Sequence, residues 1–208
     1  MRDRTPVRDA ATVILLRDQS SVLMGRRSSR ASFMPGVFVF PGGAVDRTDA
    51  QIAVNGLSAT NVALLRENSA LPPTTLAAAA IREVWEETGQ VLGHPAVWPN
   101  PPEAWRSFAA TGHRPDASHL TYFYRAVTPT GQSRRFDARF FLADAAALAT
   151  DPDDFSATDQ ELSDLQWVSL DAAVQLHIPV VTRIVLNALL MHLEKGGPIE
   201  TVPHLGTR

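Results

Sequence analysis

The chain of 208 residues is 45% hydrophobic and 20% charged, and its formal net charge is −3. This length and balance suit one globular domain over residues 1–208 with a sizeable core, and the small negative charge argues against a nucleic-acid-binding surface. Because the sequence contains no cysteine, disulfides, zinc–thiolate sites and cysteine nucleophiles are excluded. The polar residues 1–9 carry no signal region, and the longest apolar run, residues 76–81, is too short to span a bilayer. We therefore expect a cytoplasmic protein without a membrane partner.

Short strands and a glycine loop are predicted in the first quarter of the chain. A β-branched and leucine-rich run at residues 10–17 predicts a buried strand, with residues 21–24 as its partner and residues 18–20 as the turn between them. The elements predicted next are a basic loop at residues 26–30, a strand at residues 37–40 that stops at Pro41-Gly42-Gly43, and an inserted segment at about residues 46–72 with a helix near residues 59–66.

A long helix is predicted after Pro72-Pro73. Thr74 or Thr75 suits its N-cap, four alanines raise its helix propensity, and Gly89 suits its C-terminus. We expect one face of this helix to pack on a sheet, and that face comprises Ala77, Ile81, Val84, Trp85 and Thr88.

The rest of the chain alternates between strands and helices. The predicted elements are a short helix at residues 103–110, strands at residues 121–127 and 139–143, a short strand at residues 166–170, and an amphipathic helix at residues 184–193 that could start directly after Pro179. The second strand continues a period-2 pattern, with Phe136, Ala138 and Phe140 on one side and Arg135, Asp137 and Arg139 on the other. This order predicts an α/β sandwich with a mixed central sheet and no second domain.

Three carboxylates dominate the long helix. Glu83, Glu86 and Glu87 stand at i, i+3 and i+4, so they project from one face. Carboxylates this close repel one another, and a hard divalent cation such as Mg²⁺ or Mn²⁺ is the natural compensation. The alternative is a solvated helix face stabilised by i,i+4 pairing.

The residues around these carboxylates resemble a known family. The sequence Arg82-Glu83-x-x-Glu86-Glu87-x-Gly89, preceded by a Pro-Gly-Gly loop, is similar to the Nudix hydrolase signature G-x5-E-x7-R-E-u-x-E-E-x-G-u, where u is apolar. The resemblance implies an α/β/α sandwich, Mg²⁺ or Mn²⁺, and hydrolysis of a diphosphate linked to another group. It implies that Glu83, Glu86, Glu87 and the Gly42 carbonyl bind metal, and that Arg82 orients a carboxylate.

Three departures from the signature stand out. The spacing from Gly43 to Arg82 is far longer than in the signature, so an insertion splits it. Counting back eight residues from Arg82 reaches Thr74 in place of glutamate, and Gln90 stands where an apolar residue is expected. We interpret Thr74 as a helix cap that replaces the missing carboxylate.

Other pieces resemble the peroxisomal-type coenzyme A diphosphohydrolases, a Nudix subgroup with an insertion in the signature. These pieces are Phe33-Met34-Pro35-Gly36, Phe40-Pro41-Gly42-Gly43, Asp46, Arg134-Arg135-Phe136-Asp137 and Phe140-Phe141. The coenzyme A motif R-S-x3-R-x3-G-x3-F-P-G-G is matched by Arg27-Ser28, Gly36 and the glycine loop, whereas Ser32 stands at the second arginine and Arg30 is the nearest substitute.

Further residues are candidates for catalysis and substrate binding. Glu161 precedes a strand in the manner of a Nudix carboxylate that binds metal or acts as general base, with Asp159 and Asp164 as rivals and a solvated acidic loop as the alternative. The candidates for holding substrate phosphates are Arg27, Arg30, Arg134 and Arg135, with Gly43 allowing close approach of the backbone. Exposed turn arginines are the alternative for these four positions.

The favoured reaction is cleavage of coenzyme A or acyl-coenzyme A to 3′,5′-ADP and a phosphopantetheine. The alternatives are a hydrolase of ADP-ribose, NADH or a nucleotide sugar, a Nudix-fold sensor that binds a nucleotide without cleaving it, and a purely structural protein. We expect a small-molecule diphosphate as the partner and leave a homodimer open. The inserted segment could cover the site, recognise substrate or form a subunit contact.

Overall fold

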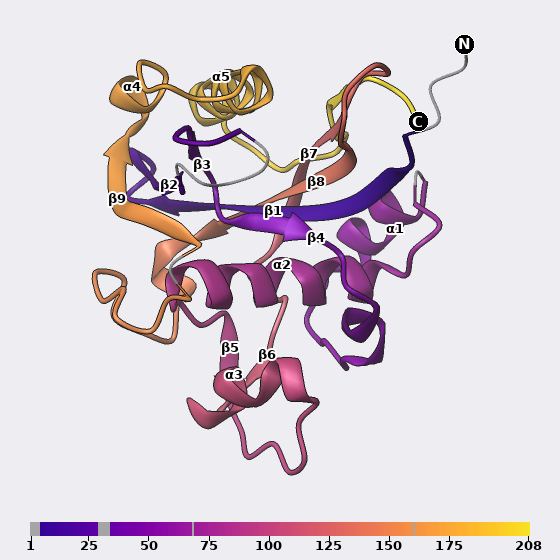
Figure 1. Ribbon diagram of the computed structural model, residues 1–208, viewed down its shortest axis with the longest axis vertical. Coiled ribbons are helices and arrows are strands. Elements are labelled where there is room, and N and C mark those ends of the chain that lie inside the picture. The colour runs from indigo at the N-terminus through magenta and orange to yellow at the C-terminus, as the bar shows by residue number, and fades with distance from the viewer. Residues whose placement is uncertain (1–4, 29–33, 68, 160) are drawn as a thin grey trace.

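The structure is a computed structural model that describes residues 5–28, 34–67, 69–159 and 161–208. Within these residues the chain forms an eight-stranded mixed sheet in the order β10-β7-β8-β1-β2-β3, with β4 beside β1 and β9 beside β2 (Figure 1). The strands of this sheet are β1 (Val7–Arg17), β2 (Ser21–Arg27), β3 (Phe38–Val39), β4 (Gly42–Ala44), β7 (Thr121–Val127), β8 (Arg135–Asp144), β9 (Leu162–Ser169) and β10 (His204–Leu205).

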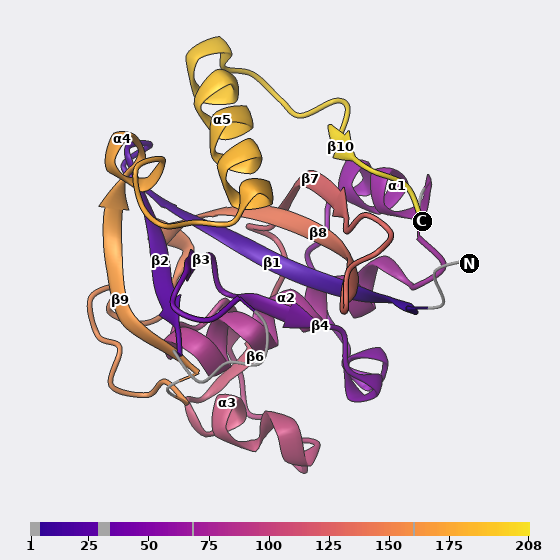
Figure 2. The same ribbon diagram turned by 45° about the horizontal axis from the view of Figure 1, so that its top comes forward.

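Helices cover both faces of this sheet. The helical elements are η1 (Arg47–Gln51), α1 (Ala59–Glu67), α2 (Pro73–Thr88), η2 (Glu103–Trp105), α3 (Arg106–Ala110), η3 (Ala145–Ala147), α4 (Leu170–Ala173) and α5 (Val180–Lys195). α2 lies along one face and α5 along the other, as Figures 1 and 2 show. The predicted α/β sandwich with a mixed sheet is confirmed.

Alternation along β1 explains the two layers. Ala11, Val13 and Leu15 belong to the core cluster that contains α2, whereas Ile14 and Leu16 belong to the cluster that contains α5. Successive side chains of a strand point to opposite faces, so one β-branched strand supplies both cores. β1 pairs parallel with β8 from Val7 and Arg135 onward and antiparallel with β2, which places it at the centre of the sheet.

The N-terminal hairpin of β1 and β2 was predicted correctly, but the predicted end of β2 was too early. The turn between β1 and β2 holds Asp18 and Gln19 at φ of 51° and 52°, a left-handed conformation that short polar turns often adopt. Arg26 and Arg27, predicted to lie in a loop, belong to β2. Arg30 lies outside the described residues.

The boundaries of α2 correct one prediction and confirm another. The N-cap is Pro72 with Pro73 at the first helical position, and no side chain caps the helix, so the predicted caps at Thr74 and Thr75 were wrong. Proline suits this position because its missing N–H would lack a helical partner anyway. Gly89 ends the helix as predicted, with φ of 71° and a hydrogen bond of 2.8 Å from its N–H to the Trp85 carbonyl.

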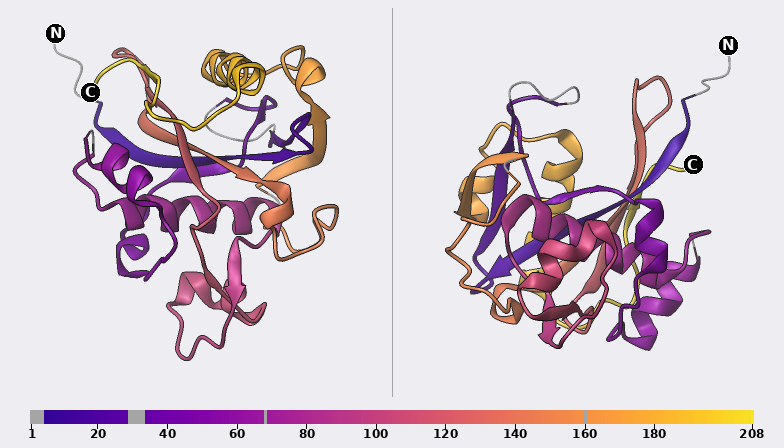
Figure 3. Two further views of the ribbon diagram at one scale, coloured as in Figure 1. Left: turned by 180° about the vertical axis from the view of Figure 1, so that it is seen from behind. Right: turned by 60° about the horizontal axis from the view of Figure 1, so that its bottom comes forward.

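Trp85 does not follow the predicted orientation. Its ring meets Phe108 edge-on with 6.0 Å between ring centroids, and its Nε1 donates to the Ser107 hydroxyl at 2.9 Å. The partners lie in or beside α3, within a lobe that also contains the two-stranded sheet of β5 (Gly93–Pro95) and β6 (His113–Pro115). Figures 1 and 3 show this lobe on the side of α2 that faces away from the central sheet, so α2 is covered on both sides.

The segment between η1 and α2, residues 52–72, is anchored through α1. The Asn61 amide donates to the Leu120 carbonyl at 2.7 Å and accepts from the Tyr122 N–H at 3.0 Å. Asn61 is buried, so both of its hydrogen bonds hold α1 against the start of β7. The predicted helix near residues 59–66 is therefore confirmed and has a structural contact. Among the described residues, no helix combines the length and apolar character needed to cross a membrane.

The polar side of β8 turns inward. Asp137 and Arg139 are almost fully buried, and Arg125 binds both Asp137 oxygens at 2.8 Å. Arg139 also pairs with Asp9, and Arg208 pairs with Asp9 and Asp137. These charges compensate one another, which is the condition for burying them.

Candidate active site

The last two turns of α2 bury an acidic cluster. Glu83 and Glu87 are 8% and 2% exposed, and Glu86 is partly exposed. Burial is the main cause that raises the pKa of Glu83 to about 7, and the charges of Glu86 and Glu161 add to it against the opposing effect of Arg82. Burial and then the Glu83 charge raise the pKa of Glu87 well above its ordinary value. The folded chain therefore disfavours the charged forms of both carboxylates.

Arg82 is the centre of the cluster. Its Nη1 donates to Glu83 Oε1 and Glu86 Oε2, both at 2.9 Å, and its Nη2 donates to the Ala44 carbonyl at 3.1 Å. Its Nε and Nη2 bind Asp49 Oδ1 and Oδ2 at 2.8 and 3.0 Å. A guanidinium has five N–H donors, and these five contacts use them all. Arg82 therefore orients carboxylates and has no donor left for a substrate.

Asp49 was missed by the sequence interpretation. It is fully buried, and besides holding Arg82 it accepts a hydrogen bond of 2.8 Å from the Asp46 N–H at the start of η1. Counted forward from Gly43, the G-x5-E part of the signature reaches Asp49, whereas the count backward from Arg82 reached Thr74. Thr74 is exposed and caps nothing, so its predicted role was wrong.

The glycine loop touches the cluster directly. The predicted strand stops before Pro41-Gly42-Gly43, because β3 ends at Val39, and Gly42 and Gly43 begin a separate strand, β4, that pairs with β1. The Gly42 N–H donates to Glu87 Oε2 at 2.7 Å. A Cβ at position 43 would lie 2.5 Å from Glu83 Oε1, so only glycine leaves room for that carboxylate.

Gly43→Ala should therefore disturb Glu83 without straining the backbone. We expect a loss of about 1–3 kcal/mol in stability, as in other overpacked cores, and a loss of activity of about 100-fold from the displaced carboxylate. Thermal denaturation and a hydrolysis assay measure the two effects. Adding Glu83→Asp shortens the acid by one methylene and should restore part of the melting temperature. An unchanged melting temperature in Gly43→Ala would contradict the packing argument.

The loop before β9 lies beside the same turns of α2. The Asp159 N–H donates to the Glu86 carbonyl at 2.8 Å, and Glu161 pairs with Arg27 through Nη2 and Oε1 at 3.3 Å. The structure thus brings Arg27, Glu161 and the acidic cluster together. The rival Asp164 pairs instead with Arg26 at 3.2 Å.

The other predicted phosphate ligands lie elsewhere or outside the described residues. Arg135 pairs in register with Val7, four residues along β1 from the partner of Gly43, which is about 13 Å along a strand. Its Nε donates to the Thr128 carbonyl at 3.2 Å, and Arg134 is exposed in the adjoining turn. Arg30 lies outside the described residues, and so do Ser32 and Phe33 of the subgroup motifs.

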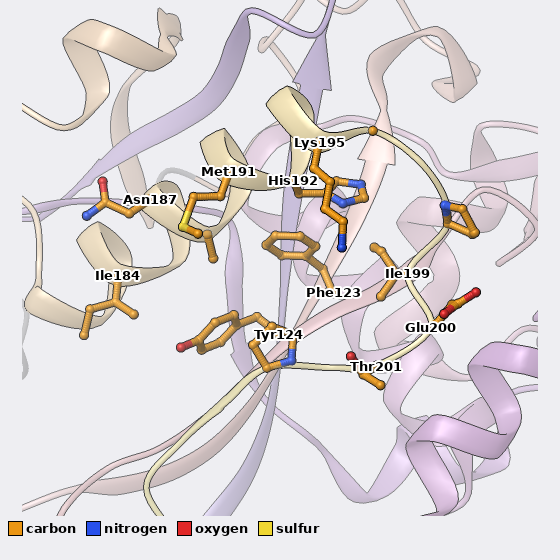
Figure 4. Close-up of a pocket in the computed structure, with 14 residues that line it drawn as sticks. Phe123, Tyr124, Ile184, Asn187, Met191, His192, Lys195, Ile199, Glu200 and Thr201 are labelled. Carbon is orange, nitrogen blue, oxygen red and sulfur yellow. The ribbon is translucent and has the colours of Figure 1, made fainter.

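A cleft opens over Arg82 and Glu86. It has a volume of about 200 Å³ and is lined by Asp46, Thr48, Arg82, Glu86 and Ala104. A larger groove of about 780 Å³ lies on the α5 side of the sheet, away from the acidic cluster. Figure 4 shows both apolar and polar side chains in its lining, with Phe123 and Tyr124 below Met191 of α5.

The candidate metal ligands are close together but engaged with the protein. In the described part of the chain, no three Asp, Glu or His side chains form a ready set of metal ligands. The cluster oxygens instead contact Arg82 and the Gly42 N–H. The donor set itself, three carboxylates short of positive charge, suits a hard divalent cation.

Comparisons with known proteins relate this arrangement, a mixed sheet between helices with a glycine loop against an R-E-x-x-E-E helix, to solved Nudix structures. A crystal structure of a Nudix hydrolase from Alicyclobacillus acidocaldarius is 27% identical, with a TM-score of 0.69 over 94% of this chain and 100% of that chain. A Caenorhabditis elegans protein named provisionally as nudix hydrolase 7 is 29% identical over 175 residues, or 77% of this chain. The chain spans about half (51%) of that relative's length.

More distant structures share the fold alone. The MutT protein of Methanosarcina mazei Go1 has a TM-score of 0.54 at 16% identity and covers 91% of this chain and 96% of that chain. A C. elegans Ap4A hydrolase in a binary complex has a TM-score of 0.52 at 17% identity and covers 91% and 100%. No protein-family model matches the chain.

Proposed function

We propose that this chain is one Nudix hydrolase domain that cleaves a diphosphate linkage in a nucleoside diphosphate derivative with the aid of Mg²⁺ or Mn²⁺. One observation carries the proposal: Glu83 and Glu87 are buried together beside Glu86, directly against the Gly42-Gly43 loop. Buried carboxylates in this number are costly unless a cation joins them. A solvated acidic face would not account for their burial.

The residues that would hold the metal are Glu83, Glu86, Glu87 and the Gly42 carbonyl. When bound, the metal would lower the pKa of a water ligand and neutralise charge on the phosphoryl groups. Arg82 keeps Glu83 and Glu86 in place from one guanidinium nitrogen. Replacing a residue that orients metal ligands in this way commonly lowers metal affinity or activity by about 10- to 100-fold.

Glu161 is the proposed general base. Its carboxylate accepts a proton from the attacking water, whose oxygen bonds to one phosphorus while the bridging P–O bond breaks and the other phosphoryl group leaves. Asp159 lies nearby but uses one oxygen to cap the Glu161 N–H at 2.9 Å. Glu161 also uses one oxygen, in its pair with Arg27, but its charge acts on both Glu83 and Glu87, which favours it over Asp159.

Coenzyme A or an acyl derivative is the proposed substrate, giving 3′,5′-ADP and a phosphopantetheine. The support is the sequence resemblance to the peroxisomal-type subgroup, in which residues 46–72 would be the insertion. Ser32 at a motif arginine and the distance of Arg135 from the glycine loop favour a second candidate, a hydrolase of ADP-ribose, NADH or nucleotide sugars.

The test is a panel of coenzyme A, ADP-ribose and NADH incubated with the protein and Mg²⁺ or Mn²⁺. We expect coenzyme A to be cleaved at its diphosphate, and a chelator to abolish the reaction. Turnover of ADP-ribose alone would select the second candidate. Tight binding in calorimetry with no product over hours would show a sensor, and undiminished turnover with chelator would refute the metal assignment. A homodimer and a cytoplasmic location stay predictions.

A further inference from the structure

Two adjacent arginines end β2, and each pairs with an acid at the start of β9. Arg26 Nη1 lies 3.2 Å from Asp164 Oδ2, and Arg27 Nη2 lies 3.3 Å from Glu161 Oε1. The strands bring them together because Arg26 is in register with Ser163 and Arg27 with Leu162. β2 and β9 lie side by side at one end of the sheet (Figure 2).

An irregularity in β9 separates the two pairs. The register shifts by one residue between Met24 and Arg26, because β9 has one more residue than β2 over this stretch. Asp164 lies in this stretch of β9 and has φ of 52°. A bulge of this kind bends a strand and redirects its side chains. Beyond it, β9 begins at Leu162, and Glu161 precedes it beside the end of α2.

The two pairs have different surroundings. The Arg26 and Asp164 side chains are both half exposed, with no contact to the acidic cluster among the described residues. The Arg27 side chain is 22% exposed, and its positive charge opposes the burial that raises the pKa of Glu87. The negative charge of Glu161 in turn raises the pKa of both Glu83 and Glu87. Arg27 therefore contacts Glu161 in the loop that Asp159 joins to Glu86 of the cluster.

Glu161 needs such a neighbour. Its side chain is 57% exposed, and the nearby carboxylates of Glu83 and Glu87 repel it. A free glutamate in a loop would turn toward solvent, away from like charge. The ion pair with Arg27 is the described contact that counters this repulsion.

We propose that Arg27 is a positioning residue that holds the Glu161 carboxylate beside the acidic cluster, and not a ligand of the substrate phosphates. This inference rests on the proposed function, in which Glu161 removes the proton of the attacking water. A misplacement of a reacting group by about 1 Å can cost about 100-fold in rate. Loss of Arg27 should therefore slow the chemical step and leave substrate binding nearly unchanged.

The structure also offers a rival. The Nε of Arg27 is buried and has no hydrogen-bond partner among the described residues, so it could instead hold a phosphate oxygen. A phosphate ligand that binds substrate and transition state alike raises KM without lowering kcat. The ratio of these two effects therefore separates the roles.

The experiment measures kcat and KM of Arg27→Gln, Arg27→Lys, Glu161→Gln and the double variant Arg27→Gln/Glu161→Gln on the fastest substrate of the panel. Arg26→Gln is the matched control, because it removes the same charge and the same type of cross-strand ion pair one residue away. Melting temperatures should stay close to that of the unmodified chain, since exposed ion pairs add little stability.

We expect Arg27→Gln to lower kcat about 10- to 100-fold with KM changed less than about threefold. Arg27→Lys should recover part of kcat, and the double variant should be no slower than Glu161→Gln, because both changes remove one function. Arg26→Gln should stay within about twofold of the unmodified chain.

Three outcomes overturn the proposal. A raised KM with unchanged kcat in Arg27→Gln would make Arg27 a phosphate ligand. Multiplicative losses in the double variant would show that the two residues act independently. Equal effects of Arg26→Gln and Arg27→Gln would reduce both to surface charge. An unmodified chain that cleaves nothing in the panel would refute the proposed function as well, whereas these three outcomes leave it standing.

Discussion

Glu86→Gln should lower the rate of diphosphate hydrolysis on the order of 1,000-fold. The substitution keeps the shape of the side chain but removes one negative charge from the proposed metal site. A cation in such a site supplies several kcal/mol of charge stabilisation to the transition state, and about 1.4 kcal/mol corresponds to a factor of ten. The measurement is initial rate against Mg²⁺ concentration for both proteins.

Stability distinguishes this loss from misfolding. Burial raises the pKa of Glu86, so the folded protein disfavours its charged form, and a neutral glutamine removes that cost. We therefore expect Glu86→Gln to melt close to the unmodified chain. Glu194→Gln on the exposed side of α5 makes the same chemical change far from the cluster and should keep full activity. Retained activity in Glu86→Gln would refute its role.

Asp49→Ala should be the most destabilising of the substitutions considered. It leaves Arg82, which is 7% exposed, without its bidentate partner. Removing one partner of a buried ion pair typically costs about 3–5 kcal/mol because the other charge stays buried. In a chain of this size that corresponds to a melting temperature lower by roughly 10 °C. Thermal denaturation measures the change.

Two variants test the origin of this loss. Asp46→Ala removes the other half of the same capping box at an exposed position and should cost only about 1 kcal/mol. Arg82→Met in the Asp49→Ala background removes the uncompensated charge, so the double variant should be less destabilised than the sum of the single variants. Equal losses for Asp46→Ala and Asp49→Ala would show that capping alone is at stake.

Local signals explain which elements could be predicted from the sequence. The β-branched run of β1, the glycine at the end of α2 and the amphipathic pattern of α5 each depend on near neighbours, and the structure bears them out. The prediction of where α2 starts was wrong because Thr74 and Thr75 resemble N-caps, whereas a helix that starts with Pro73 has no side-chain cap here. The predicted orientation of Trp85 was wrong because a second layer, the lobe that contains α3, covers α2 on the side away from the sheet.

The candidate site was only half visible in the sequence. The spacing of Glu83, Glu86 and Glu87 predicts their shared face, since three and four residues make one helical turn. Their burial and the five contacts of Arg82 depend on β4, η1 and α2 meeting in space. No periodicity encodes that meeting. Asp49 was within reach, because the signature counted from its glycine end leads to it.

The bidentate ion pair between Asp49 and Arg82 has a consequence for how such proteins diversify. Because this contact fixes η1 against α2, the intervening chain does not have to measure out the site by its own length. Doubling a flexible connection costs only about 0.6 kcal/mol. Residues 52–72 can thus grow, shrink or gain a helix such as α1 over generations while the geometry of the acidic cluster persists, and sequence patterns that demand a fixed gap will overlook the result.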